Sequence, residues 1–155
     1  MTFLLQVVEN LRSYLMSDEL ANAAGVSTHT ALETIPLVIG SRFRRRIIGT
    51  GGYVMNRAGL SLFISSINKT NCSPNTVSSM EDGLISDCMK SNGAKIPITE
   101  RDGKQRFSRF SPTIFYTQKI ARFVGTKCCI EELISLHYMR PWEMEWFYCM
   151  LYGVQ

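Results

Sequence analysis

The sequence predicts a mixed α/β fold that contains too few strands for a complete doubly wound sheet. Short segments rich in β-branched residues lie at 36–43 and 45–49, between segments whose apolar residues repeat with helical spacing. The chain has 155 residues, of which 45% are hydrophobic, so it can bury the core of one domain. Together these observations predict a folded α/β unit that is part of a domain.

The N-terminal segment is predicted to be helical. Over residues 2–16, apolar side chains recur every four positions, at Phe3, Val7, Leu11 and Leu15. Residues 17–35 are polar and rich in small side chains, which predicts a loop or an insertion. The two predicted strands, at 36–43 and 45–49, follow this segment.

A glycine-rich turn is expected next, at residues 49–52, because glycine adopts the backbone angles of tight turns. Asn56 is a candidate N-cap for a helix after this turn. The expected apolar face of that helix consists of Leu60, Phe63, Ile64 and Ile67. The remaining expected elements are a helix over 81–91, a strand over 94–99, a loop over 100–112 and a helix that begins at Pro141.

The net charge and the sorting signals limit the classes of partner and the cell compartments that we expect for this chain. The net charge is +4, and the basic cluster at 41–46 is interpreted as a solvated face or, second, as an anion site. Without a helix-turn-helix, zinc-finger or RNA-binding signature, we expect no nucleic-acid partner. No segment has the length of a transmembrane helix, and the N-terminus does not fit a signal peptide. Asn68 and Asn71 each begin an N-glycosylation tripeptide, which hints at secretion.

Three short patterns carry candidate chemistry, and each has a structural alternative. Glu81 and Asp82 either stabilise a helix N-terminus or supply a carboxylate that removes a proton from a sugar hydroxyl. The segment "GTGGYVM" at 49–55 does not fit G-x-G-x-x-G, so it is either a turn or a backbone that a ligand approaches closely. His137 ends an apolar run and is either a core histidine or a metal ligand.

The five cysteines and the aromatic C-terminal segment have structural interpretations as well. A bridge between Cys72 and Cys88 would close a loop of about 16 residues and stabilise the fold by about 3 kcal/mol. The vicinal Cys128 and Cys129 are expected to reach distant partners rather than each other. The C-terminal aromatics are interpreted as core, with an exposed Trp142 as an alternative stacking platform for a sugar.

The order of the motifs resembles that of one enzyme family. "VVENLRSYL", "SRF", "GTGGYVMNRAGL", "MEDGLISDC" and "KCCIEELISLHYM", followed by "EMEWFYCML", occur in this order. This is similar to the C-terminal part of the core 1 β1,3-galactosyltransferases, the glycoprotein-N-acetylgalactosamine 3-beta-galactosyltransferases of the fringe-related glycosyltransferase family. The resemblance runs from Thr2 to about Tyr152. It implies an incomplete GT-A fold, in which a mixed sheet is flanked by helices and the N-terminal nucleotide-binding strands are missing.

The resemblance also implies an activity and its residues. Family members transfer galactose from UDP-galactose to the 3-hydroxyl of N-acetylgalactosamine on Ser or Thr of glycoproteins, with inversion. Asp82 matches the catalytic base, His137 matches a ligand of the Mn²⁺ cofactor, and Cys72 and Cys88 match a disulfide. The implied substrate-binding residues are Gly51, Gly52, Tyr53, Glu81 and Trp142.

One departure from the family pattern concerns the metal. The family's Asp-x-Asp segment, whose carboxylates hold manganese, precedes the "ENLR" motif, and Met1 stands where that segment should end. We therefore expect residues 1–155 to be the acceptor-side part of one galactosyltransferase domain, without its membrane anchor and inactive alone.

The resemblance further implies a type II membrane protein on the lumenal side of the Golgi. Its partners would be UDP-galactose and a glycoprotein acceptor that carries N-acetylgalactosamine, and a homodimer is compatible with it. The alternatives are a non-catalytic relative, such as the chaperone of the core 1 enzyme, and a fringe-like β1,3-glycosyltransferase.

Overall fold

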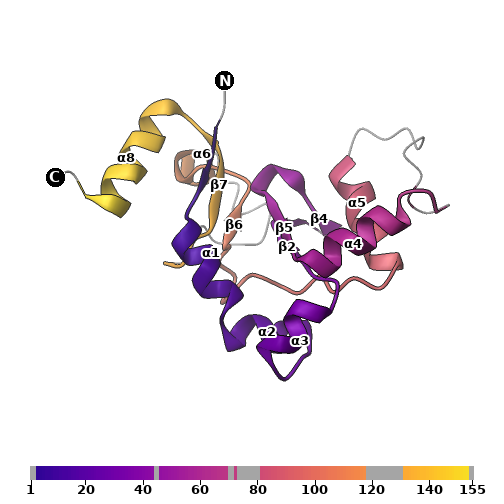
Figure 1. Cartoon of the computed structure of the whole chain (residues 1–155). Coiled ribbons are helices and arrows are strands. Elements are labelled where there is room, and N and C mark those ends of the chain that lie inside the picture. Colours follow the sequence, from indigo (N-terminus) through magenta and orange to yellow (C-terminus); the bar gives the residue numbers. More distant parts are fainter. Residues whose placement is uncertain (1–2, 44–45, 70–71, 73–80, 118–130, 154–155) are drawn as a thin grey trace.

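The computed structural model describes residues 3–43, 46–69, 72, 81–117 and 131–153. Within these segments, small β-sheets lie between helices (Figure 1). The predicted mixed α/β class is confirmed, and the elements are compatible with part of a glycosyltransferase-like fold. None of the helices in the described segments is long and apolar enough to cross a bilayer.

A three-stranded sheet brings the first described strand beside one near the C-terminus (Figure 1). Strand β1 (Phe3–Gln6) pairs antiparallel with β7 (Ser135–Met139), which pairs parallel with β6 (Phe107–Ser108). Because β7 has one extra residue opposite Leu4, His137 and Tyr138 form a β-bulge. Such a bulge redirects side chains at the edge of a sheet.

The helix predicted for residues 2–16 is wrong in its first part. Residues Phe3–Gln6 form β1, and helix α1 covers only Val8–Leu15. Between the two, the Val7 N–H donates a hydrogen bond to the Ile134 carbonyl at 2.8 Å. The backbone of Phe3–Gln6 forms its hydrogen bonds with β7, a strand distant in sequence. Helical periodicity reports only neighbouring residues, so it does not predict this pairing.

The loop predicted for residues 17–35 is also wrong, because the segment forms two short helices. They are α2 (Asp18–Ala24) and α3 (His29–Thr34). The side-chain oxygens of Ser17 and Thr28 cap them by accepting hydrogen bonds from backbone N–H groups three residues on. Its small and apolar residues enter the core, and the fully or nearly fully buried ones are Leu20, Ala21, Ala24 and Leu32.

The predicted strands at 36–43 and 45–49 are present as three short strands. Strand β2 (Val38–Gly40) pairs antiparallel with β5 (Tyr53–Met55). Strands β3 (Arg42–Phe43) and β4 (Arg46–Ile47) pair antiparallel with each other. The 3₁₀ turn η1 (Gly49–Gly51) then leads from β4 to β5.

Helix α4 (Arg57–Ser66) begins at Asn56, as predicted, because the Asn56 Oδ1 accepts a hydrogen bond from the Gly59 N–H at 2.7 Å. Its predicted apolar face is wrong in part. Leu60 and Ile64 are exposed, whereas Gly59 is buried. A Cβ at Gly59 would lie 2.6 Å from the Leu37 carbonyl oxygen, so this position has space only for glycine. Gly59 and Ser66 are the buried residues of this helix, and Leu62 and Phe63 pack partly against the core, so apolar periodicity identifies only part of its buried face.

Helix α5 (Glu81–Ser91) is the helix predicted for this segment. Its Cys88 forms a disulfide with Cys72, the pair implied by the family resemblance. Gly93, which follows the helix, has a φ of +95°, typical of a helix stop.

Two predicted elements near residue 100 are wrong. In segment 94–99, only Lys95 takes part in β pairing, through an isolated bridge to Leu37. The predicted loop 100–112 instead contains β6, which pairs with β7. In the described segments, helices α6 (Pro112–Thr117) and α8 (Pro141–Tyr152) come later in the chain, and α8 begins at the predicted proline.

Buried clusters fix these elements around the turn η1. One cluster joins α1, α2 and α3 to β2 and β6, and the buried Arg106 lies over the ring of its member Tyr14. Arg106 forms an ion pair with Glu19 at 2.6 Å. A second cluster consists of Val38, Ile47, Met89 and Ala94 and packs α5 on β2 and β4. This packing places the first turn of α5 next to η1.

Candidate functional site around the Gly49–Gly51 turn

The turn η1 needs glycine at position 51 because this position lies very close to the Ser41 side chain. A Cβ atom at Gly51 would lie 2.4 Å from the Ser41 Cβ and 3.3 Å from the Arg109 backbone nitrogen. Gly52 has a φ of +79°, which L side chains rarely adopt. Gly51 therefore closely approaches Ser41 and Arg109 within the protein, and the approach of a ligand to this segment stays a prediction.

Asp82 contacts this turn from the first turn of α5. Its Oδ2 accepts a hydrogen bond from the Gly49 N–H at 2.6 Å, and its Oδ1 accepts one from the Gly83 N–H at 2.7 Å. The structural and the functional interpretation of Asp82 are thus compatible with one geometry: it lies at a helix N-terminus, and it is held in a fixed orientation. A carboxylate has about four acceptor positions, so each oxygen keeps the capacity to accept a further hydrogen bond. Its neighbour Glu81 is exposed.

Strand β7 contacts the other end of the turn. The Ser135 hydroxyl donates a hydrogen bond to the Gly51 carbonyl. His137 follows two residues later, in the β-bulge, where Tyr138 has an unusual positive φ of 55°. The His137 Nδ1 is buried without a hydrogen-bond partner, and burial lowers the pKa of its imidazole. The imidazole is therefore neutral at pH 7.

The described residues do not fit a complete manganese site. His137 is a suitable nitrogen ligand, because its Nδ1 has no partner. Mn²⁺ favours carboxylate, carbonyl and water oxygens in octahedral geometry. In the described segments, however, no three His, Cys, Asp or Glu side chains come together as a metal-binding group.

An arginine in contact with two aromatic rings is a feature that the sequence reasoning missed. The Arg109 Cζ lies 5.0 Å from the ring centroid of Phe110 and 5.7 Å from that of Phe43. Phe110 stacks on Tyr138 with ring centroids 6.1 Å apart, and Tyr138 contacts His137 at 4.3 Å. We call these five residues the Arg109 stack. The pattern "RFSRF" in the segment predicted as a loop was the only local signal for it.

Three residues that contact the turn or belong to it have a buried polar atom without a hydrogen-bond partner. The Nε of Arg109 is buried without a hydrogen-bond partner, as are the Oγ of Ser41 and the Oγ1 of Thr50. Ser41 precedes the β3–β4 hairpin, Thr50 is the middle residue of η1, and the backbone of Arg109 lies beside Gly51. The unpaired atoms of Ser41 and Thr50 are therefore buried at the turn itself, whereas only the backbone of Arg109 lies beside it.

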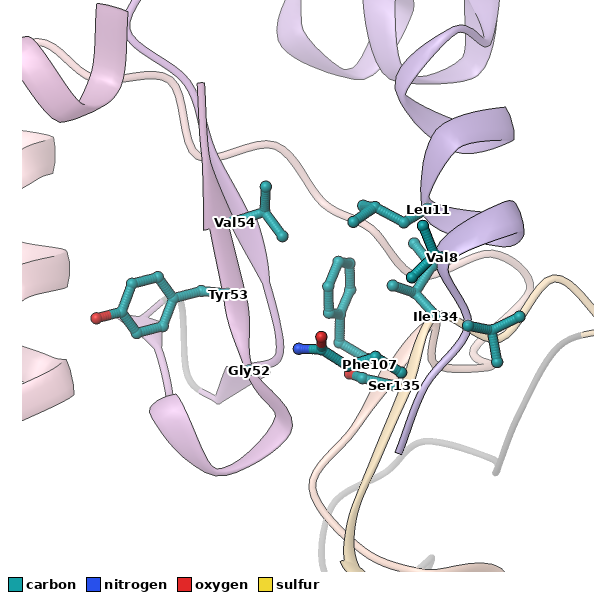
Figure 2. A pocket seen from close by; sticks show the side chains of 10 residues that line it. Val8, Leu11, Gly52, Tyr53, Val54, Phe107, Ile134 and Ser135 are labelled. Atoms are coloured by element: carbon teal, nitrogen blue, oxygen red, sulfur yellow. The ribbon is translucent and has the colours of Figure 1, made fainter. Parts of the chain in front are cut away.

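Gly52 and Tyr53 also line a small hollow between β5 and α1 (Figure 2). Its volume is about 20 Å³, the space that one water molecule needs, so it does not hold a sugar. Figure 2 shows the Tyr53 ring pointing away from Val54, Leu11 and Phe107, and Tyr53 is 38% exposed. A role of Tyr53 in substrate binding therefore belongs to the outer face of β5 and not to this hollow.

The other predicted residues lie apart from the turn or outside the description. Trp142 is half exposed in the first turn of α8. Asn68 is exposed after α4, as a glycan acceptor must be. Asn71, Cys128 and Cys129 lie outside the described residues, and Cys149 is an exposed free thiol. The structure thus brings Asp82, Gly51 and the strand of His137 to one turn.

Comparison with known proteins gives the site a chemical context. No family model matches the sequence. The glycoprotein-N-acetylgalactosamine 3-beta-galactosyltransferase 1 of Xenopus laevis is 30% identical to this chain over 140 residues, a match that covers 77% of this chain. The chain is related to the glycosyltransferases. The match spans 38% of the length of this galactosyltransferase. We therefore treat galactose transfer by this chain as a proposal.

Proposed function

We propose that this chain is the acceptor-side part of an inverting β1,3-galactosyltransferase. It would transfer galactose from UDP-galactose to the 3-hydroxyl of N-acetylgalactosamine that is O-linked to Ser or Thr of a glycoprotein. The observation that carries this proposal is Asp82, held against η1 by the Gly49 N–H in a chain related to a galactosyltransferase.

In this proposal Asp82 is the general base. Its free acceptor capacity takes the proton from the 3-hydroxyl as that oxygen forms a bond to the anomeric carbon of galactose. The bond from the anomeric carbon to the diphosphate oxygen breaks, and its electron pair leaves with UDP. Attack and departure on opposite sides invert the anomeric configuration. The two backbone N–H groups hold the carboxylate in place, which keeps the base aligned with one hydroxyl.

The remaining proposed roles surround this base. We propose Gly51, Gly52, Tyr53, Glu81 and Trp142 as the substrate-binding residues. His137 is proposed as one ligand of Mn²⁺, whose role in this reaction class is to neutralise the diphosphate. The 155 residues contain no Asp-x-Asp, so we expect no turnover by this chain alone. A lumenal Golgi location is also part of the proposal, and the disulfide supports an oxidising compartment.

A chimera tests the reaction. In the Xenopus laevis galactosyltransferase, this chain replaces the matched segment, and the purified protein is given UDP-galactose, Mn²⁺ and a peptide with N-acetylgalactosamine on threonine. Mass spectrometry and NMR of the product then report transfer and linkage. We expect a β1,3-linked product, and its loss on Asp82→Asn. A chimera that binds UDP but yields no product contradicts the proposal.

Acceptor binding by the 155-residue chain gives a second readout that does not need the chimera to fold. Saturation-transfer NMR is recorded with the N-acetylgalactosamine peptide, with the same peptide carrying N-acetylglucosamine, and with the bare peptide. We expect saturation of the N-acetylgalactosamine ring and little for the other two. Equal saturation of the bare peptide overturns acceptor recognition and favours the non-catalytic, chaperone-like alternative.

A further inference from the structure

Helix α5 is followed by two residues whose chemistry the proposed function does not use. Asn92 and Gly93 come directly after Ser91, the last residue of the helix, and they are the one Asn-Gly pair in the sequence. In such a pair the glycine nitrogen can attack the asparagine side-chain amide, because glycine has no Cβ that hinders the approach or restricts the backbone. Gly93 is exposed, so solvent reaches this nitrogen.

The side-chain amide of Asn92 is held against the disulfide. Its Nδ2 donates hydrogen bonds to the Cys88 carbonyl at 2.9 Å and to the Cys72 Sγ at 3.2 Å. Its Oδ1 accepts a hydrogen bond from the Lys69 Nζ at 3.0 Å. Rotation of the amide toward the Gly93 nitrogen breaks these hydrogen bonds. Two of them depend on the cysteines that the bridge joins.

The backbone nitrogen that would attack is engaged as well. The Gly93 N–H donates a hydrogen bond to the Lys90 carbonyl at 3.2 Å, and the Ala94 N–H donates one to the Met89 carbonyl at 2.9 Å. With the φ of +95° at Gly93, these hydrogen bonds form the helix stop. Reaction at Asn92 therefore needs local opening of this end of α5, and its rate follows the population of the open state.

We infer that Asn92 is a deamidation site that the Cys72–Cys88 disulfide keeps closed and that a thiol reductant opens. Thiol exchange converts the bridge to two cysteine thiols while the reductant becomes a disulfide. In the open state the Gly93 nitrogen gives its proton to solvent and bonds to the Asn92 Cγ. The bond from Cγ to Nδ2 then breaks, and Nδ2 takes a proton and leaves as ammonia. Water opens the cyclic imide at either carbonyl, which leaves aspartate or isoaspartate at position 92.

The carboxylate formed in this reaction acts back on the bridge. Where the Asn92 Nδ2 donates to the Cys88 carbonyl and the Cys72 sulfur, a carboxylate offers only lone pairs to two acceptors. Its negative charge also lies at the C-terminal end of α5, where the helix dipole disfavours an anion. The exposed Lys69 offsets little of this cost. Deamidation therefore favours the reduced form of the bridge.

Peptide mapping by mass spectrometry tests the site. The oxidised 155-residue chain, the same chain in dithiothreitol and a free peptide of residues 89–96 are incubated at mildly alkaline pH, and deamidation at Asn92 is followed with time. We expect the oxidised chain to react about tenfold or more slowly than the peptide, and the reduced chain to approach the peptide. Circular dichroism recorded in parallel shows whether the reduced chain keeps its helices.

Two variants assign the effect to this bridge. Cys72→Ala/Cys88→Ala should deamidate at the fast rate without any reductant. Cys149→Ser should keep the slow rate in the oxidised form, since Cys149 is an exposed free thiol. Equal rates for the oxidised chain and the peptide, or for the oxidised chain and the folded double variant, overturn the inference.

A redox titration covers the case in which loss of the bridge unfolds the chain. The fraction of reduced bridge is measured against the thiol-to-disulfide ratio for the unaltered chain, for Asn92→Asp and for the control Asn22→Asp. Asn22 is exposed in the last turn of α2, so the control adds the same charge at a comparable place. We expect Asn92→Asp to shift the midpoint toward the reduced form by about threefold or more, and the control to leave it unchanged. An unchanged midpoint in Asn92→Asp overturns the link between Asn92 and the bridge.

Discussion

The Asp82 carboxylate and the Gly49 backbone are joined by a hydrogen bond of 2.6 Å, which ties the first turn of α5 to the turn η1. Because the Gly83 N–H holds the other oxygen at 2.7 Å, the carboxylate has one orientation. The same contact therefore stabilises the fold and aligns the proposed base.

Asp82→Asn separates these two roles. The amide keeps the shape and one acceptor oxygen but cannot take a proton from a hydroxyl. We expect transfer by the chimera to fall by about 10²–10⁴-fold, the usual contribution of a general base. The free energy of unfolding, measured by urea denaturation, should fall by only about 1 kcal/mol.

The control for this substitution is Asp87→Asn on the same helix. Asp87 forms a half-exposed ion pair with Arg46, and such pairs contribute little to stability. We expect the control to transfer galactose at the unaltered rate. If Asp82→Asn keeps its rate within threefold of this control, Asp82 is a helix-terminal residue and not the base.

Gly51→Ala and Gly49→Ala form a matched pair within one turn. The new Cβ at Gly51 would lie 2.4 Å from the Ser41 Cβ, whereas at Gly49 it would lie 3.4 Å from the Asp82 Cβ, an ordinary contact. We expect Gly51→Ala to lower the free energy of unfolding by about 2–3 kcal/mol, and Gly49→Ala to change it far less. Urea denaturation of both variants checks the difference.

A second substitution tests whether Ser41 is the cause of this cost. In Gly51→Ala combined with Ser41→Gly, the clashing Cβ is gone, so part of the lost stability should return. Strict additivity of the two single effects would show that the backbone of Arg109, and not Ser41, limits the space at Gly51.

The elements that could be predicted from the sequence are those with local signals. Asn56 caps α4, Pro141 begins α8, and adjacent carboxylates at 81 and 82 begin α5, because each signal acts within one helical turn. The capping residues Ser17 and Thr28 give similar signals, but the small and polar residues between them obscured two short helices that each bury part of one face.

The parts that could not be predicted depend on contacts between distant segments. Strand β1 depends on pairing with β7, and the bulge at His137 exists only in that pairing. The Arg109 stack joins residues from β3, from the segment after β6 and from β7. No periodicity within one segment encodes such a cluster, whereas the acidic pair at α5 was visible as a candidate base.

The disulfide gives a stability prediction with its own control. Cys72 and Cys88 are separated by 16 positions, and a bridge that closes such a loop stabilises a fold by about 3 kcal/mol. We expect a reductant to lower the melting temperature of the unaltered chain, and Cys72→Ala/Cys88→Ala to remove that sensitivity. Cys149→Ser should retain it, since Cys149 is an exposed free thiol. Full reductant sensitivity in the double variant would assign the effect to other cysteines.

Tyr14 gives a prediction for the pH dependence of stability. Burial raises the pKa of its phenol to about 12; Arg106 opposes this rise, and Glu19 adds to it. Since the folded pKa lies above the unfolded value near 10, the neutral phenol contributes its full stability below pH 10. That contribution decreases as the pH rises from 10 through 12. The loss approaches roughly 2–3 kcal/mol above this window.

Tyr14→Phe should therefore flatten the alkaline part of the stability curve. The Tyr14 hydroxyl is buried without a hydrogen-bond partner, so its removal leaves no unpaired group, and we expect equal or slightly higher stability at pH 7. Above pH 10, the variant should gain stability relative to the unaltered chain, as measured by urea denaturation at each pH. Tyr53→Phe on the exposed β5 face is the control and should follow the unaltered curve. If the stability curves of Tyr14→Phe and the unaltered chain run parallel above pH 10, burial does not raise the pKa of the Tyr14 phenol, and the prediction is wrong.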